Sequence, residues 1–508
     1  MPDRRDGDGD RHESNGFAVD PPGPRQWTGW VLGPAALLFT LLVPPPEGLG
    51  VEGWRTAGAG LFMAIFWITE PMPIPVTALL PLVLFPLLGL ATVQVAAAPF
   101  ANPIIFLFLG GFIIALAMER WNLHRRVAIG LIDVMGTRPA AIVGGFLLAS
   151  ALISMWVSNT ATALMMLPIA MSVTRLLPTG AARTSEVRHL GTAVVLAVAY
   201  GSTSGGMATL IGTPPNALLA GYMSETYGVT IGFGQWMLLG VPVMLVTLPA
   251  VYFVLTRLMF TLDTRELPGM SALIAEQKSG LGRLGGAELA VAVVFGLTAA
   301  AWVVQPLLAR IVPLISDTTI AIAGALVLFV VPVNWRRGEF VMTWEATRGV
   351  PWGVLLLFGG GLSLAANVDR HGLSTYLGGL AGSLESLPML LILCVVCFGI
   401  LMLTELTSNT ATAATFLPIT GALALSLGQN PLLFLIPTAL AANCSYMMPV
   451  GTPPNAIVYG SGLVTLPQMA RAGLILNVAL VPILVGLLLL LASAVFGVEI
   501  GVVPAWVR

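Results

Sequence analysis

Charged residues are scarce in this sequence. Asp, Glu, Lys and Arg make up 9% of its 508 residues, whereas hydrophobic residues make up 56%, and the mean hydropathy is +0.90. Because a soluble domain carries about 25% charged residues, this scarcity excludes an ordinary globular protein. Apolar runs near the roughly 20 residues needed to cross a bilayer recur along nearly the whole chain. We therefore predict an all-α polytopic protein embedded in a lipid bilayer.

Cysteine, histidine and net charge are also low, with three cysteines, four histidines and a formal charge of −1. Cys394 and Cys397 form a CxxC pattern with no βαβ pattern around it, so we interpret them and Cys444 as apolar packing residues rather than redox or metal groups. All four histidines fall in the N-terminal tail or in interfacial loops, which argues against a Ser-His hydrolase within the membrane. We expect no enzyme and, without a basic field, no nucleic-acid partner.

The N-terminal residues 1–26 are charged and rich in Gly and Pro, which predicts a disordered cytoplasmic tail. The first apolar segment lacks a small-residue cleavage site, so we expect a retained transmembrane helix at 27–53 rather than a signal peptide. Two later segments, 189–226 and 432–464, are long enough to be broken helices. In all, about 11 transmembrane helices are predicted, within residues 28–45, 54–71, 74–95, 103–119, 189–226, 234–260, 288–310, 316–334, 350–368, 432–464 and 470–497.

One polar motif occurs twice in otherwise apolar surroundings. SNTATALMMLPI occupies residues 158–169, and SNTATAATFLPI occupies residues 408–419. Each copy lies near the middle of an apolar interval, 136–176 or 385–426. We predict that both intervals are re-entrant helical hairpins, which enter and leave the membrane on the same side and carry the motif at the tip.

A second motif, GTPPN, follows each hairpin in the same order and begins at Gly212 and Gly451. Because Pro-Pro removes backbone donors and clashes with the preceding turn, each copy should break its long helix within the membrane. Unwound segments at that depth are tolerated where they line a cavity or bind something. Their free carbonyl oxygens, with the Thr and Asn oxygens, suit a hard cation such as Na⁺.

The basic residues predict the orientation of the chain. With the N-terminus in the cytoplasm, 23 Lys and Arg minus four leaves 19 on the inside. The four on the outside are Arg55, Arg310, Arg370 and Arg508. The two hairpins then enter from opposite faces, as an inverted-topology repeat requires. The predicted organisation in the cell (inner) membrane is repeat 1 (54–260), a cytoplasmic loop (261–287) and repeat 2 (288–508), with the C-terminus outside.

Ser, Asn and Thr at the start of a helix suit the binding of an anion. They are strong N-caps, and a helix N-terminus carries partial positive charge and unpaired N–H groups. The two predicted tips would therefore give two anion cradles. Because no Arg or Lys falls at the predicted midplane, a bound cation is the simplest source of compensating charge, and it would couple the binding of anion and cation.

With these motifs the chain resembles the divalent anion:sodium symporter family, the Na⁺-coupled dicarboxylate and citrate carriers. The two SNT motifs, ELTSNTATAATFLP at 405–418 and the two TPPN loops carry the resemblance, which extends over everything after the tail. It implies a homodimer whose protomers each have a scaffold part and a transport part that moves as an elevator. It implies substrate contacts at Ser158, Asn159, Thr160, Thr213, Pro214, Ser408, Asn409, Thr410, Thr452 and Pro453. It implies one Na⁺ site at Ser154, Asn159, Gly205 and Gly206, and another at Thr404, Asn409 and Pro449.

The expected function is Na⁺-coupled symport of C4-type dicarboxylates such as succinate, malate and fumarate. Alternatives remain open: a Na⁺-independent dicarboxylate exchanger, a proton-coupled carrier and, further off, a sulfate carrier or an anion channel. Glu405 is the candidate proton acceptor, and its other interpretation is a structural one, holding its hairpin by hydrogen bonds. Glu70, in WITEPMPIP, is expected to be structural at a helix end near the cytoplasmic interface.

Overall fold

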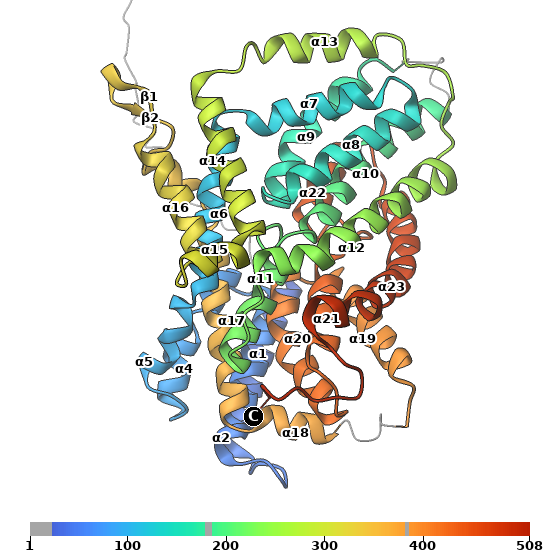
Figure 1. Cartoon of the computed structure of the whole chain (residues 1–508). Helices are drawn as coiled ribbons and strands as arrows, with labels where there is room; N and C mark the ends of the chain where they lie inside the picture. Colours follow the sequence, from blue (N-terminus) through green and yellow to red (C-terminus); the bar gives the residue numbers. More distant parts are fainter. Residues whose placement is uncertain (1–22, 178–184, 381–385, 508) are drawn as a thin grey trace, which may run out of the picture.

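The computed structural model describes residues 23–177, 185–380 and 386–507. Within these residues the chain is almost entirely helical, with one short antiparallel pair of strands, β1 (Pro332–Asn334) and β2 (Glu339–Phe340). Figure 1 shows α13 at one end of the molecule and the C-terminus at the other. Residues 1–22 of the predicted tail lie outside the described residues.

The first half contains α1 (Pro24–Leu42), α2 (Val51–Thr69), α3 (Ile74–Thr77), α4 (Pro81–Leu87), α5 (Val93–Ala97), η1 (Ala98–Ala101), α6 (Pro103–Arg120), α7 (Leu123–Met135), α8 (Pro139–Ser154), α9 (Asn159–Thr174), α10 (Ser185–Gly206), α11 (Pro214–Tyr227), α12 (Phe233–Phe253) and the π-helix η3 (Val254–Met259). The second half contains α13 (Met270–Gly280), α14 (Gly286–Val303), α15 (Gln305–Ile311), α16 (Asp317–Val330), η4 (Trp335–Arg337), η5 (Glu345–Gly349), α17 (Trp352–Arg370), α18 (Leu373–Leu380), α19 (Met389–Thr404), α20 (Asn409–Ser426), α21 (Leu432–Asn443), α22 (Pro453–Gly460) and α23 (Leu466–Phe496).

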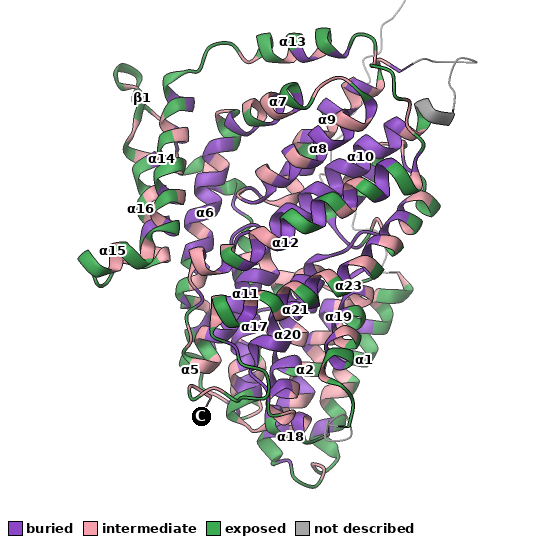
Figure 2. Ribbon diagram, turned by 45° about the vertical axis from the view of Figure 1, so that its right-hand side comes forward, coloured by how far each residue is buried: buried purple, intermediate pink, exposed green. Residues whose placement is uncertain are grey.

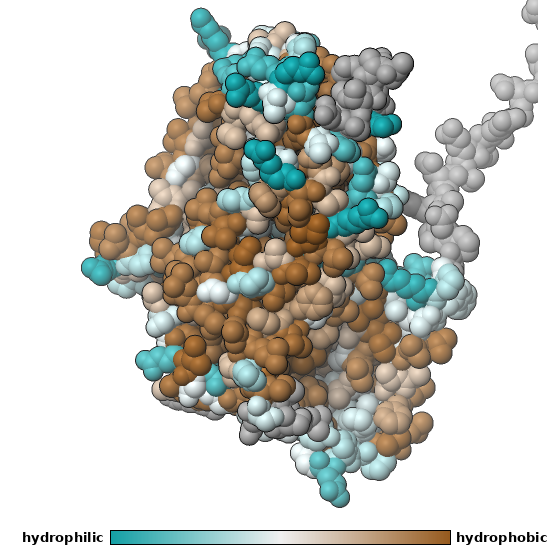
Figure 3. Space-filling model, turned by 90° about the vertical axis from the view of Figure 1, so that its right-hand side faces the viewer, coloured by the Kyte–Doolittle hydropathy of each residue, from teal (hydrophilic) through white to brown (hydrophobic). Residues whose placement is uncertain are grey.

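The surface and the helices are those of a membrane protein. Among the described helices, five are long and apolar enough to cross a membrane, judged by length and composition: α6, α12 with its extension η3, α14, α17 and α23. Shorter apolar helices include α8, α9, α19 and α21. Figure 3 shows apolar side chains over most of one face, with hydrophilic ones mainly at its upper end and along its edges. A lipid-facing surface has this distribution, because a bilayer has an apolar middle and polar edges.

Several segments differ from the sequence prediction. α1 begins at Pro24, so residues 24–26 are helical rather than part of a disordered tail, and it ends at Leu42 rather than at 53. It ends there because a proline run follows, and proline cannot continue a helix. The single helix predicted at 74–95 is three short ones, α3 to α5, since prolines and the positive φ of Gly89 interrupt it. The predicted loop at 261–287 contains α13.

Both intervals that carry the SNT motif turn back at it. α8 ends at Ser154 and α9 begins at Asn159, while α19 ends at Thr404 and α20 begins at Asn409. The two long segments are interrupted at GTPPN: α10 and α11 are separated by residues 207–213, and α21 and α22 by residues 444–452. α10 packs against α8 and α9, and α21 packs against α19 and α20, so both halves have the same local arrangement.

The core is formed by these same elements. Figure 2 shows buried residues concentrated in α8, α10, α11 and α21, whereas α13 and α15 are largely exposed. Every residue of α21 is buried. The polar SNT and GTPPN segments are therefore held by the most buried helices of the molecule.

Candidate functional site

A cavity of about 940 Å³ lies where the two hairpin tips and the two interrupted helices meet. All ten predicted substrate residues line it, namely Ser158, Asn159, Thr160, Thr213, Pro214, Ser408, Asn409, Thr410, Thr452 and Pro453. The rest of its wall comes from α1, α3, α6, α9, η5, α17, α22 and neighbouring loops. Residues about 250 positions apart in the sequence therefore share one site.

The two tips are capped differently. The Ser158 hydroxyl accepts a hydrogen bond of 3.3 Å from the backbone N–H of Ala161, which caps α9 as the motif predicts. Ser408 does not cap α20 with its side chain. In both tips the first-turn N–H groups of a helix lie beside the cavity, and these groups have no partner within the helix. Each tip therefore offers an anion the positive end of a helix dipole.

Three oxygen atoms surround the side-chain amide of Asn159 below the first tip. These are the hydroxyl oxygen of Ser154 at 2.6 Å and the carbonyl oxygens of Ser202 and Gly212 at 3.2 and 3.3 Å. With its nitrogen turned toward them, the amide donates to all three. With its oxygen turned toward them, the four atoms form an oxygen cluster of the kind that binds a hard cation.

The backbone must come close to Asn159 for this cluster to form. A Cβ atom on Gly206 would lie 2.7 Å from the amide oxygen of Asn159 and 3.1 Å from the carbonyl oxygen of Gly212, so a larger residue would displace the amide. Gly205, which was predicted with it, packs against α8 instead, since a Cβ there would lie 2.1 Å from the carbonyl oxygen of Ala151. The carbonyls near the Asn159 amide are that of Gly212, in the predicted GTPPN break, and that of Ser202, which the sequence did not single out.

A matching group lies below the second tip. The Thr404 hydroxyl lies 2.8 Å from the amide oxygen of Asn409 and 2.7 Å from the carbonyl oxygen of Ala442. The amide nitrogen of Asn409 donates to the carbonyl of Asn443 at 3.1 Å. Pro449, predicted to contribute its backbone here, lines the cavity, whereas the carbonyls that contact this pair are at the end of α21.

The last residue of each GTPPN motif holds the unwound segment in shape. Asn216 donates to the carbonyls of Gly206 and Thr209 at 3.2 and 2.8 Å. Asn455 donates to the carbonyls of Ser445 and Met448 at 3.2 and 3.0 Å. Both amides thus fix a segment that cannot make regular helical hydrogen bonds.

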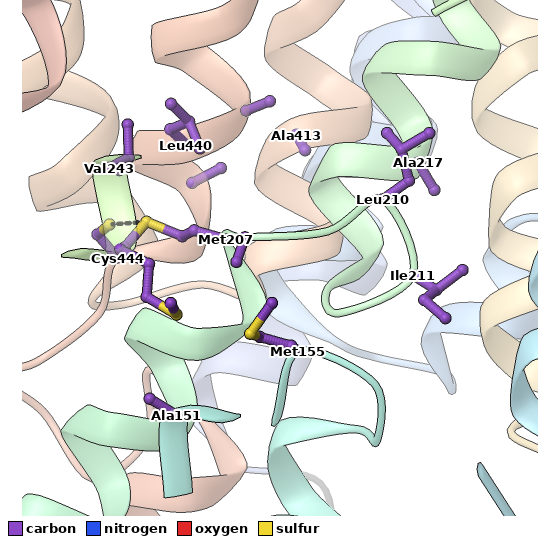
Figure 4. Close-up of a cluster of buried hydrophobic side chains, with 14 of the residues drawn as sticks. Ala151, Met155, Met207, Leu210, Ile211, Ala217, Val243, Ala413, Leu440 and Cys444 are labelled. Carbon is purple, nitrogen blue, oxygen red and sulfur yellow. Dashed lines mark hydrogen bonds between the residues drawn. The ribbon is translucent and has the colours of Figure 1, made fainter. Parts of the chain in front are cut away.

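Hydrogen bonds join the two halves at the two breaks, between α10 and α11 and between α21 and α22. The Thr213 hydroxyl donates to the side-chain oxygen of Asn443 at 2.6 Å, and the Asn443 amide donates to the carbonyl of Thr203 at 2.9 Å. Figure 4 shows Met207 and Cys444, the first residues after α10 and α21, with their sulfur atoms in contact at 3.4 Å. Cys444 is a buried packing residue here, consistent with the sequence interpretation.

Glu405 is buried and surrounded by donors. Its carboxylate accepts hydrogen bonds from the Ser445 hydroxyl, the Asn477 amide and the backbone N–H groups of residues 446–448, at 2.7 to 3.0 Å. These bonds fix the loop after α21 to the second hairpin, in line with the structural interpretation of Glu405.

The site contains no cluster of conventional transition-metal ligands. Within the described ranges, no group of three or more His, Cys, Asp or Glu residues could hold a metal ion. The ligands around Asn159 and Asn409 are neutral hydroxyl, amide and carbonyl oxygens. These suit an alkali cation and disfavour zinc or iron.

Comparison with known proteins agrees with this geometry. The family described as the sodium:sulfate symporter transmembrane region matches residues 25–498. The chain belongs to this family of divalent anion:sodium symporters. The predicted family is therefore confirmed, and the chain is a membrane transport protein rather than an enzyme.

Curated relatives include two named sodium-dependent dicarboxylate transporter SdcS. The proteins from Staphylococcus saprophyticus and from Staphylococcus aureus (strain bovine RF122) are each 40% identical over 482 residues, which cover 94% of this chain and 93% of the relative. Among solved structures, the Alcanivorax borkumensis YdaH transporter is similar with a TM-score of 0.56 at 14% identity, over 93% of this chain and 98% of that one. The Neisseria gonorrhoeae MtrF structure has a TM-score of 0.53 at 12% identity, over 92% and 95%. At such low identities these two structures support the transporter fold alone.

Proposed function

We propose that the protein is a secondary active transporter that carries C4-type dicarboxylates together with Na⁺. The single observation that carries the proposal is the pairing of the two tips across one cavity, each with an oxygen cluster beneath it. The name of the SdcS relatives, sodium-dependent dicarboxylate transporter, supports the same substrate and ion.

The two tips account for a substrate with two carboxylates. Each tip presents helix N–H groups and the side chains of Ser, Asn and Thr, so each can receive one carboxylate. A C4 acid such as succinate, malate or fumarate has its two carboxylates at its two ends. The substrate contacts are Ser158, Asn159 and Thr160 at one end and Ser408, Asn409 and Thr410 at the other, with the GTPPN loops closing the sides.

The oxygen clusters account for Na⁺ as the co-transported ion. One ion is held by Ser154, Asn159 and the carbonyls of Ser202 and Gly212, and another by Thr404, Asn409 and the carbonyls of Ala442 and Asn443. Asn159 and Asn409 belong to both the ion site and the tip. Because each ion lies next to a bound carboxylate, anion and cation stabilise each other, which is the coupling that symport requires.

Transport by this arrangement needs alternating access. The two hairpins and the interrupted helices form the moving transport part of an elevator, and the remaining helices form the scaffold of a homodimer. The hairpins are re-entrant, the halves form an inverted repeat, and the N-terminus is cytoplasmic in a cell membrane. The position of α13 and the C-terminus at opposite ends of the molecule supports the assignment of the two to opposite sides of the membrane, and the distribution of Lys and Arg chooses between the two orientations.

A flux experiment tests the proposal. Purified protein in liposomes should accumulate radiolabelled succinate when Na⁺ is high outside and low inside, and not when K⁺ replaces Na⁺. Malate and fumarate should compete more strongly than citrate or sulfate. Equal uptake without Na⁺ would indicate an exchanger, uptake driven by a pH gradient a proton-coupled carrier, and preferential sulfate uptake a sulfate carrier. Currents without coupled Na⁺ flux would indicate a channel.

A further inference from the structure

Arg25 lines the cavity, although the sequence prediction placed it in a disordered tail. It lies in the first turn of α1, and its guanidinium donates twice to the carbonyl of Ile68 at the end of α2. It also donates to the carbonyl of Leu406, within the second tip, at 3.5 Å. α1 packs along α2, so these bonds fix the guanidinium beside the rim of the site.

Arg25 is the one positively charged residue among the described residues that line the cavity. Among the described residues that line the cavity, three carry a charge: Arg25, Glu70 and Glu119. The Arg25 guanidinium lies 3.6 Å from the Glu70 carboxylate, and the two side chains are 49% and 45% exposed. Exposed ion pairs of this length are weak and screened, so the guanidinium is accessible to another anion.

Glu70 is held in an uncommon conformation beside Arg25. It is the C-cap of α2 in the left-handed region, with φ 52°, and its carbonyl accepts a hydrogen bond from Gln26 at 3.3 Å. Non-glycine residues in that region occur where the surroundings impose the conformation. The backbone conformation of Glu70 therefore holds its carboxylate next to the Arg25 guanidinium at the edge of the cavity.

We propose that Arg25 is a specificity-determining residue that draws doubly charged anions into the cavity, an inference that rests on the proposed dicarboxylate transport. The tips themselves offer only neutral donors, so the long-range attraction of a dianion from solution needs a full positive charge at the mouth. The attraction grows with the charge of the ligand, so Arg25 favours the dianion of a dicarboxylate over a monoanion. Glu70 and Glu119, the two carboxylates that also line the cavity, oppose this attraction.

Association kinetics test this role. Binding of succinate to the purified full chain is followed by stopped-flow fluorescence at fixed Na⁺, with ionic strength raised by choline chloride. Arg25→Gln should lower the association rate constant on the order of tenfold at low ionic strength and flatten its dependence on salt, because steering by a charge is screened. Arg25→Lys should keep most of the rate. The half-saturating Na⁺ concentration should stay unchanged.

Two further variants separate steering from a structural role. Arg55→Gln removes another arginine that donates to a helix-end carbonyl, Leu88 at 3.1 Å, but does not line the cavity, and it should leave the rate unchanged. Glu70→Gln should raise the association rate, which damage to the fold cannot do. An unchanged rate and salt dependence in both Arg25→Gln and Glu70→Gln would overturn the inference. Absence of Na⁺-dependent succinate binding in the wild-type chain would instead overturn the proposed function.

Discussion

The Thr404 hydroxyl lies 2.8 Å from the amide oxygen of Asn409, five residues later in the chain. The hydroxyl of Ser154 lies 2.6 Å from the amide of Asn159 at the same spacing in the first half. The hydroxyl residue differs between the halves, but its spacing from the asparagine is the same, and each group includes a backbone carbonyl from the neighbouring broken helix. This repetition is the basis for placing one cation beneath each tip.

Removing either tip asparagine tests the proposed substrate site. Asn159→Ala and Asn409→Ala should each reduce Na⁺-dependent succinate uptake by roughly 10- to 100-fold, since losing a hydrogen bond to a charged group costs about 1.5–3 kcal/mol. Uptake is measured in proteoliposomes with equal amounts of protein. Asn334→Ala, in β1 and away from the cavity, is the matched control and should transport normally. Wild-type uptake in either tip variant would remove the proposed site.

The second cation group is tested through its hydroxyl. Thr404→Val keeps the shape of the side chain but removes the oxygen, so the Na⁺ activation curve of succinate uptake should move to higher Na⁺. Thr404→Ser keeps the oxygen and should stay near wild type. Thr420→Val changes a threonine on the same hairpin that bonds to Phe416 in its own helix and to Thr438 of α21, and it should have no effect on Na⁺ activation. An unshifted curve for Thr404→Val contradicts the assignment.

The alanines that follow the two SNT motifs differ in exposure, and cysteine labelling can measure this difference. Ala161 lines the cavity, whereas Ala411, at the same place in the second motif, is only 1% exposed. In a chain with its three native cysteines replaced, Ala161→Cys should react with an impermeant maleimide from one side of the membrane, and Na⁺ with succinate should slow the reaction. Ala411→Cys should react far more slowly. Equal labelling of Ala161→Cys from both sides in every condition would argue against a moving gate.

The buried carboxylate of Glu405 should matter for stability. Glu405→Gln places an amide NH₂ where the backbone N–H groups of residues 446–448 point, so at least one donor loses its acceptor. We expect destabilisation of about 2 kcal/mol or more, measured as a lower melting temperature in detergent. Glu345→Gln, at an exposed position, is the control. A melting temperature unchanged from wild type would show that the hydrogen-bond network has little energetic weight.

Much of the site follows from the sequence because duplication is visible there. The repeated SNT and GTPPN motifs identified the residues that line the cavity, and the Pro-Pro pairs identified the two helix breaks. The carbonyl ligands were less accessible to sequence reasoning. The carbonyl of Ser202 lies beside the Asn159 amide and that of Ala442 accepts from the Thr404 hydroxyl, so both act through the main chain and their side chains give no signal.

The sequence was a poorer guide to the helix boundaries and to the position of Arg25. Hydropathy averaged over a window joined α3, α4 and α5 into one helix, although the prolines within the window interrupt it. Arg25 was assigned to the tail because the residues before it are polar, yet Pro24 starts α1 and brings the guanidinium to the cavity. A single basic residue next to an apolar run has the same sequence signature whether it faces solvent or a buried site.

The dependence of succinate affinity on Na⁺ tests the central claim most directly. Isothermal titration calorimetry of the purified protein gives the Kd of succinate as choline is replaced by Na⁺ at constant ionic strength. If neutral tips hold the dianion and bound cations supply the missing positive charge, the Kd should fall by about tenfold or more between the two extremes. A succinate Kd that is the same in choline and in Na⁺ would contradict the account.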